Sequence, residues 1–238
     1  MLSSFGIKRV VHYTPLHYLP FISREGALLA KTGLSTAGFT KKHFRSKSAH
    51  HDKARGFEAF VHLTTDEFAP ILRAKLAAGF PHVAIIIPSD GVEKCTFDLC
   101  RFNIAMTRHL RRGSSPGYPE NAANGRYYDG CQVPIARSDS EKRSLLAANL
   151  GKNMIELLVH ARLELPAEVV VQCFHEGDLD ISQHVLGHLG KKNWASILEK
   201  PKCKYPRNDQ YVRKVKQFVT RALDEPKWSG DGLEFDKV

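Results

Sequence analysis

The stretch Asn153-Met154-Ile155-Glu156-Leu157-Leu158-Val159 contains one acidic residue within a segment that otherwise predicts a buried β-strand. Glutamate is almost never fully buried unless it is paired with another group or bound to a ligand. Glu156 therefore has two interpretations. In the first, it lies at the edge of its strand and bonds to a neighbouring arginine or to the backbone. In the second, it belongs to a functional site.

The composition is that of an ordinary globular protein. The chain has 238 residues, of which 42% are hydrophobic and 25% are charged, and this is enough for one large domain or for a domain with an appendage. The sequence has no run of about 18 apolar residues, and residues 1–8 lack the basic and then apolar order of a signal peptide. We therefore expect a cytoplasmic protein that does not cross a membrane.

The charge balance points to a polyanionic partner. The net charge is +10 and the pI is about 9.4, and such a surplus of Lys and Arg concentrates nucleic acid near the surface. The surplus gathers in residues 191–223, with ten Lys or Arg against two acids, and in residues 41–55, with six against one. Each run is also consistent with a solvated face.

The five cysteines are an odd number and include no Cys-x-x-Cys pair. This spacing indicates neither a disulfide framework nor a zinc site. We therefore expect reduced thiols and no bound metal.

Hydrophobic periodicity and turn residues predict a chain of strands and helices. Residues 9–14 predict a first strand that ends at Pro15, and a short helix follows between Leu16 and Leu29 with Gly26 as its stop. The continuously apolar residues 83–88 predict a strand buried on both faces. The remaining predictions are strands at 57–63 and 167–174, an extended segment at 102–106, helices at 67–78, 138–150 and 211–223, and loops at 32–55 and 113–129. The 167–174 strand is expected to form a hairpin with the Glu156 strand or to lie next to it.

Three patches of the sequence resemble one known family. The first is His12-Tyr13-Thr14 followed by residues 19–22 and 26–29, the second is residues 52–55 ahead of the strand at 60–63, and the third is Glu156-Leu157-Leu158-Val159. They are similar to segments of the DarT family of DNA-targeting ADP-ribosyltransferase toxins. In that family, the first patch leads from a strand into a helix and a glycine turn, the second supplies a key arginine, and the third supplies the catalytic glutamate.

The resemblance implies an α+β fold, namely the ADP-ribosyltransferase-like fold with a central split β-sheet flanked by helices, plus a basic helical C-terminal segment. It implies a catalytic domain at residues 1–190 and a basic C-terminal appendage at residues 191–238. NAD is the implied co-substrate, and DNA or RNA is the implied acceptor. A toxin of this kind also implies a neutralising antitoxin protein as a partner.

The expected chemistry accounts for the residue types in these patches. Cleavage of the bond between nicotinamide and ribose passes through an oxocarbenium-like sugar, which a nearby carboxylate stabilises. Glu156 supplies this carboxylate and can also accept a proton from the attacking group. Arg55 has the forked geometry that suits the NAD pyrophosphate. His12 and Thr14 suit the nicotinamide amide and the ribose.

The candidate catalytic residues are therefore Glu156 and Arg55. The candidate NAD-binding residues are His12, Tyr13, Thr14, Lys53, Arg55 and His62. Two of these residues have clear alternatives, since His12 is also consistent with a hydrogen-bonded structural histidine and Arg55 with a solvent-facing cation. The order of the three patches along the chain favours the functional interpretation.

The sequence thus predicts an NAD-dependent mono-ADP-ribosyltransferase that modifies a base of DNA or RNA, as a toxin of a toxin–antitoxin or phage-defence system. Two alternatives stay open. One keeps the fold and uses a protein or a small molecule as the acceptor. The other is a nucleic-acid-binding module without catalysis, in which Glu156 is structural. The glycine-rich phosphate loops of Rossmann and P-loop proteins are absent, which excludes hydride transfer and nucleoside triphosphatase activity.

Overall fold

The computed structural model describes residues 1–36, 57–65, 70–100, 135–151, 155–199, 205–225 and 227. The strands are β1 (Arg9–Pro15), β2 (Ala27–Leu29), β3 (Phe60–Thr64), β4 (His82–Pro88), β5 (Phe97–Cys100), β6 (Ile135–Ala136), β7 (Glu156–His160), β8 (Arg162–Glu164), β9 (Val169–Cys173) and β10 (Trp194–Leu198). The helices are α1 (Leu19–Glu25), α2 (Lys31–Thr36), α4 (Pro70–Ala77), α5 (Ser89–Glu93), α7 (Asp139–Asn149), α8 (Glu176–His188) and α9 (Asp209–Asp224). Short 3₁₀ turns lie at η1 (Ser3–Phe5), η2 (Leu16–Tyr18) and η3 (Phe57–Ala59).

Eight of the described strands form one sheet in the order β10-β9-β4-β1-β3-β7-β5-β6, and β2 and β8 form a second, small sheet. Strands β10 and β9 run parallel, and the other neighbouring pairs are antiparallel. The large sheet is nearly divided between β1 and β3, which share the single residue pair Val11↔Thr64. By contrast, β1 pairs with β4 over seven residues and β3 with β7 over five. The sheet is therefore split into two halves that meet at one point.

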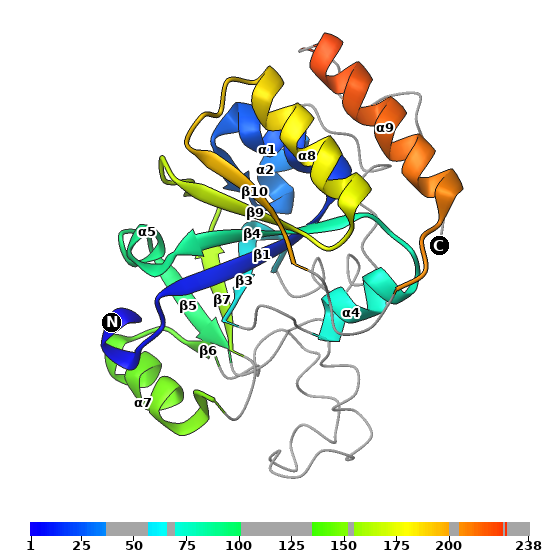
Figure 1. The fold of residues 1–238 in the computed structure, drawn as a ribbon. Helices are drawn as coiled ribbons and strands as arrows, with labels where there is room; N and C mark the ends of the chain where they lie inside the picture. The colour runs from blue at the N-terminus through cyan, green and yellow to red at the C-terminus, as the bar shows by residue number, and fades with distance from the viewer. Residues whose placement is uncertain are drawn as a thin grey trace.

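Helices cover both faces of the large sheet (Figure 1). On one face, α1, α8 and α9 lie together over β4 and β9, and their apolar side chains share one cluster that includes Leu16, Leu19, Val83, Val171, Ile181, Val185, Val215, Val219 and Leu223. On the other face, α4 packs Leu72 and Leu76 against Val11, Ala84 and Ile86. Alternate residues of β4 thus serve two cores, which explains why its sequence is apolar almost throughout and confirms the prediction of a doubly buried strand.

The N-terminal segment follows the prediction as far as Gly26. Strand β1 ends at Pro15, α1 follows, and Gly26 caps the helix with a left-handed φ of 63° while its N–H donates to the Ile22 carbonyl. The helix stops at Gly26, as predicted. The reversal at Gly26 leads into β2, in which Ala27 pairs with Glu164 of β8, so a tertiary partner sets the conformation of residues 27–29.

The predicted pairing of the Glu156 strand with the 167–174 strand is wrong. Strand β7 lies between β3 and β5, whereas β9 lies between β10 and β4 in the other half of the sheet. Between them the chain passes through Ala161, which has a left-handed φ of 56°, and then through β8, which pairs with β2. The chain therefore leaves the large sheet after β7 and returns to it at a distant position.

The segment after residue 190 packs as part of the same body. Strand β10 pairs with β9 over five residues, from Trp194↔Val169 to Leu198↔Cys173, and α9 buries Val215, Val219 and Leu223 in the cluster that it shares with α1 and α8. The expected basic helix is present as α9. However, these contacts differ from those of an appendage, because removal of residues 191–238 would take away a strand and one wall of a core.

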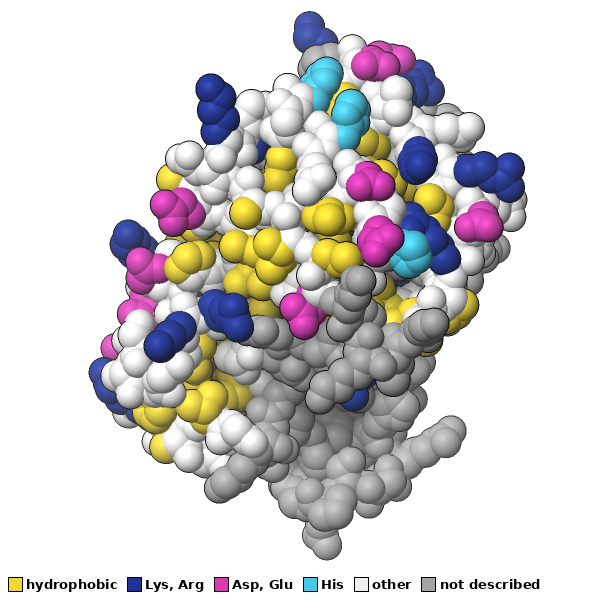
Figure 2. All heavy atoms as spheres, viewed as in Figure 1, with side chains coloured by type: hydrophobic (Ala, Val, Ile, Leu, Met, Phe, Trp, Pro, Cys, Tyr) yellow, Lys and Arg dark blue, Asp and Glu magenta, His cyan; other side chains and the backbone are white. Residues whose placement is uncertain are grey.

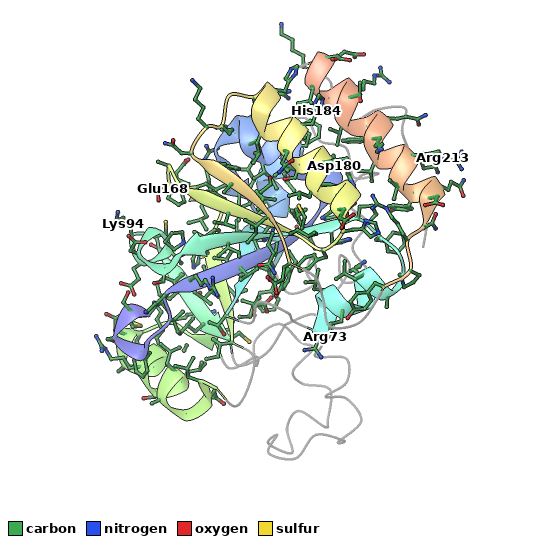
Figure 3. All side chains as sticks on the ribbon, viewed as in Figure 1. Arg73, Lys94, Glu168, Asp180, His184 and Arg213 are labelled. Carbon is green, nitrogen blue, oxygen red and sulfur yellow. The ribbon has the colours of Figure 1, made fainter. Side chains whose placement is uncertain are left out.

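The basic residues of α9 lie on its outer side. Arg213 and Lys216 are exposed, and Figure 3 shows Arg213 pointing away from α8. On the face shown in Figure 2, Lys and Arg side chains are scattered beside Asp and Glu and do not gather in one band. Among the described residues, charges of both signs are therefore mixed on this face.

Helix α7 confirms the helix predicted at 138–150. It begins with a capping box, in which the Ser138 hydroxyl accepts from the Glu141 N–H and the Glu141 carboxylate accepts from the Ser138 N–H. The predicted loop at 32–55 begins later than expected, since Lys31–Thr36 form α2. Residues 37–56, the predicted segments at 102–106 and 113–129, Cys131 and Cys203 lie outside the described residues.

Candidate active site

Glu156 is the first residue of β7 and lies in the interior of the sheet. It pairs with Thr64 of β3 on one side and with Cys100 of β5 on the other, and it is only 4% exposed. Glu156 thus begins its strand, and strands flank it on both sides. A carboxylate at this depth requires a hydrogen-bonding partner.

His62 of β3 is that partner. Its Nδ1 lies 3.0 Å from Glu156 Oε1, and its Nε2 lies 3.1 Å from the backbone oxygen of Phe57 in η3. The contact follows from the register, since Thr64 lies opposite Glu156 and His62 is two residues away on the same face of β3. The sequence predicted His62 as an NAD-binding residue, and its observed contact is with the candidate catalytic glutamate.

His12 reaches the same group from the other side of the split. Its Nδ1 donates to the backbone oxygen of His62 over 2.9 Å. This bond takes the place of a backbone ladder bond between β1 and β3, which pair at Val11↔Thr64 alone. Burial lowers the pKa of His12 to about 4, despite the bond to the His62 carbonyl, which raises it. His12 is therefore neutral at pH 7, with its proton on Nδ1 and an acceptor lone pair on Nε2.

Tyr13 and Thr14 complete the end of β1. Thr14 is 4% exposed and shares a face of the strand with His12. Tyr13 lies on the opposite face, where it packs against the cluster formed by α4 and the middle of the sheet. The structure thus connects His12, His62 and Glu156 by hydrogen bonds and assigns Tyr13 to packing. Arg55 and Lys53 lie outside the described residues.

A second buried carboxylate on the same face of the sheet was missed from the sequence. Asp98 of β5 lies opposite Leu158 and is 6% exposed. Its Oδ2 accepts a hydrogen bond from Nε2 of His160 at 3.3 Å. The signal was an acid inside the apolar segment Phe97-Asp98-Leu99-Cys100, which is the same pattern that singled out Glu156.

Within the described residues, no group of three or more His, Cys, Asp or Glu side chains is arranged to hold a metal ion. No helix in the described part of the chain is both long enough and apolar enough to span a membrane.

Known protein families, sequences and structures provide a comparison for this fold. No protein-family model and no curated protein sequence matches the chain. Solved structures of DarT from Thermus sp. 2.9 do match. The complex with ADP-ribosylated ssDNA is 14% identical, over 82% of this chain and 95% of that chain, with a TM-score of 0.51.

This chain has the fold of DarT. The second structure, DarT in complex with carba-NAD+, agrees, with 12% identity over 84% of this chain and 98% of that chain and a TM-score of 0.50. The match to DarT confirms the predicted α+β fold class with its central split sheet. At this level of identity, the likeness is one of fold.

Proposed function

We propose that the chain is an NAD-dependent ADP-ribosyltransferase that modifies a base of DNA. The observation that carries the proposal is the buried Glu156, which lies at the split of a DarT-like sheet and is connected through His62 to the neutral His12. A carboxylate in a water-poor site stabilises a developing positive charge far better than it would in bulk water. This is the requirement for breaking the bond between nicotinamide and ribose.

In the proposed reaction, the ribose C1′–nitrogen bond of NAD breaks and nicotinamide leaves with the bonding electrons. The Glu156 carboxylate stabilises the oxocarbenium-like sugar, and an acceptor nitrogen or hydroxyl then bonds to C1′. The acceptor proton passes to Glu156 or to water. His12 offers its unprotonated Nε2 as an acceptor for a ribose hydroxyl or for the nicotinamide amide. Thr14, Lys53 and Arg55 are proposed to contribute to NAD binding, with Arg55 on the pyrophosphate.

Two observations support DNA as the acceptor. One of the solved DarT structures contains ADP-ribosylated ssDNA, and the net charge of +10 favours a polyanion. The proposal includes the role of a toxin in a toxin–antitoxin or phage-defence system, a neutralising antitoxin protein as a partner, and a cytoplasmic location. Because β10 pairs with β9 and α9 packs in the core shared with α1 and α8, the proposed catalytic unit includes residues beyond 190.

The test is incubation of the purified protein with labelled NAD and separate pools of single-stranded DNA, duplex DNA, RNA and protein. We expect release of nicotinamide and transfer of label to single-stranded DNA. Glu156→Gln, with its folding checked by circular dichroism, is the control. If label appeared on protein alone, the proposed acceptor would be a protein and not DNA. Absence of nicotinamide release from every pool would refute the transferase and favour the binding module.

A further inference from the structure

His62 contacts both Glu156 and His12, which lie far apart in the sequence. Its ring bonds to Glu156, and its backbone oxygen accepts from His12 across the split. We propose that His62 is a positioning residue, whose ring holds the Glu156 carboxyl group in one orientation at the split and whose backbone oxygen fixes the tautomer of His12. This inference rests on the proposed function, and it adds a residue whose role that function does not specify.

Two contacts hold the His62 ring. The Phe57 backbone oxygen can only accept a hydrogen bond, so the Nε2 of His62, at 3.1 Å, donates to it. The Nδ1 lies 3.0 Å from Glu156 Oε1, which is within hydrogen-bond distance. The ring therefore links the carboxyl group of Glu156 to the backbone of η3.

The bond to His62 also fixes the direction in which the Glu156 carboxyl group points. A glutamate side chain has three rotatable bonds, and Glu156 is the first residue of its strand. A bond to His62, whose ring is itself held at Phe57, restricts the carboxylate to one orientation. Loss of the ring should therefore lower the rate of the chemical step more than the affinity for NAD, because the transition state depends on the position of the charge.

The variants are His62→Phe, which keeps the aromatic volume, and His62→Gln, which keeps one donor toward Glu156. The matched control is His160→Gln, which removes another histidine–carboxylate bond from the same face of β7, at a side chain that is 48% exposed. We expect His62→Phe to lower kcat on the order of ten- to a hundredfold, the range for residues that orient a catalytic group, with KM for NAD changed less than about threefold. His62→Gln should recover part of kcat, and His160→Gln should match the wild type.

A second measurement does not depend on activity. Ring nitrogen NMR shifts of the wild-type protein should show the Nδ1 of His62 in a hydrogen bond that Glu156→Ala removes, and His12 neutral with its proton on Nδ1. A His62 Nδ1 signal that Glu156→Ala leaves unchanged, or a His62→Phe variant with wild-type kcat, would overturn the proposal. If the wild type releases no nicotinamide, the proposed function fails, while the NMR result still decides whether His62 holds the carboxyl group of Glu156.

Discussion

Replacement of Phe218 by alanine tests whether α9 belongs to the cooperative core. Phe218 is 1% exposed, and its ring lies edge-on to those of His17 and Phe21, with centroids 5.1 Å and 5.8 Å away. A buried Phe→Ala change costs about 3–5 kcal/mol of unfolding free energy through lost transfer energy and a residual cavity, and two aromatic pairs are lost with it. We expect a loss of about 4 kcal/mol for the whole chain, because α1, α8 and α9 share one cluster.

The assay is urea unfolding followed by far-UV circular dichroism, together with hydrogen exchange of the sheet amides. The urea midpoint should fall in one transition without a change in its slope, and the amides of β4 should exchange faster. Lys216→Ala, at an exposed position on the same helix, is the matched control and should change stability by less than about 0.5 kcal/mol. If Phe218→Ala loosened α9 alone and left exchange in β4 unchanged, α9 would be an appendage and the reasoning would be refuted.

Four further predictions concern the site, the charge and the pH dependence. Glu156→Gln should lower kcat on the order of a hundredfold or more by removing the carboxylate, measured as nicotinamide release, and near wild-type turnover in a folded variant would contradict its role. Arg55→Ala should raise KM for NAD with a smaller change in kcat, and unchanged affinity on titration with NAD would exclude Arg55 from the site. Burial lowers the pKa of His82 to about 4, so between pH 6.5 and 4 the unfolded chain takes up a proton before the folded chain does. The free energy of unfolding should therefore decrease as the pH decreases, by up to about 3 kcal/mol. His82→Gln should reduce the dependence of urea-measured stability on pH in that window, with the rest due to His12, whose pKa is also about 4, and an unchanged slope would show that His82 does not contribute. If α9 contacts phosphates, replacing Arg213 and Lys216 by alanine should reduce the slope of log affinity for DNA against log salt by about 1–2, whereas an unchanged slope would place the DNA elsewhere.

Local signals explain which elements could be predicted. The strand at residues 9–14, the stop at Gly26 and the doubly buried strand at 83–88 depend on proline, glycine and apolar runs within a few residues, and all three are present. The three-residue strands β2 and β8 are too short for any period, and each exists because the other pairs with it. The position of β9 was wrong for the same reason, since pairing with β4 and β10 is decided by residues distant in the sequence.

The site was predictable in its residue types and not in its contacts. An acid in an apolar strand identified Glu156, and it would equally have identified Asp98. The bond between His62 and Glu156 depends on the register Thr64↔Glu156, which a shift of one residue would abolish by turning the side chains to the other face. The role of Arg55 stays a prediction, because that residue lies outside the described part of the chain.

The split sheet also determines when during synthesis the site can exist. The half that carries His12 contains β1, β4, β9 and β10, so it takes strands from residues 9–15 to residues 194–198. The half that carries Glu156 needs β3, β5, β6 and β7. The half that carries Glu156 has all four strands once residue 160 has been made, whereas the half that carries His12 also needs β10 at residues 194–198. Contacts between strands that are far apart in sequence form late in folding. The two halves can therefore form the complete split sheet in a nascent chain only after residue 198 has been made.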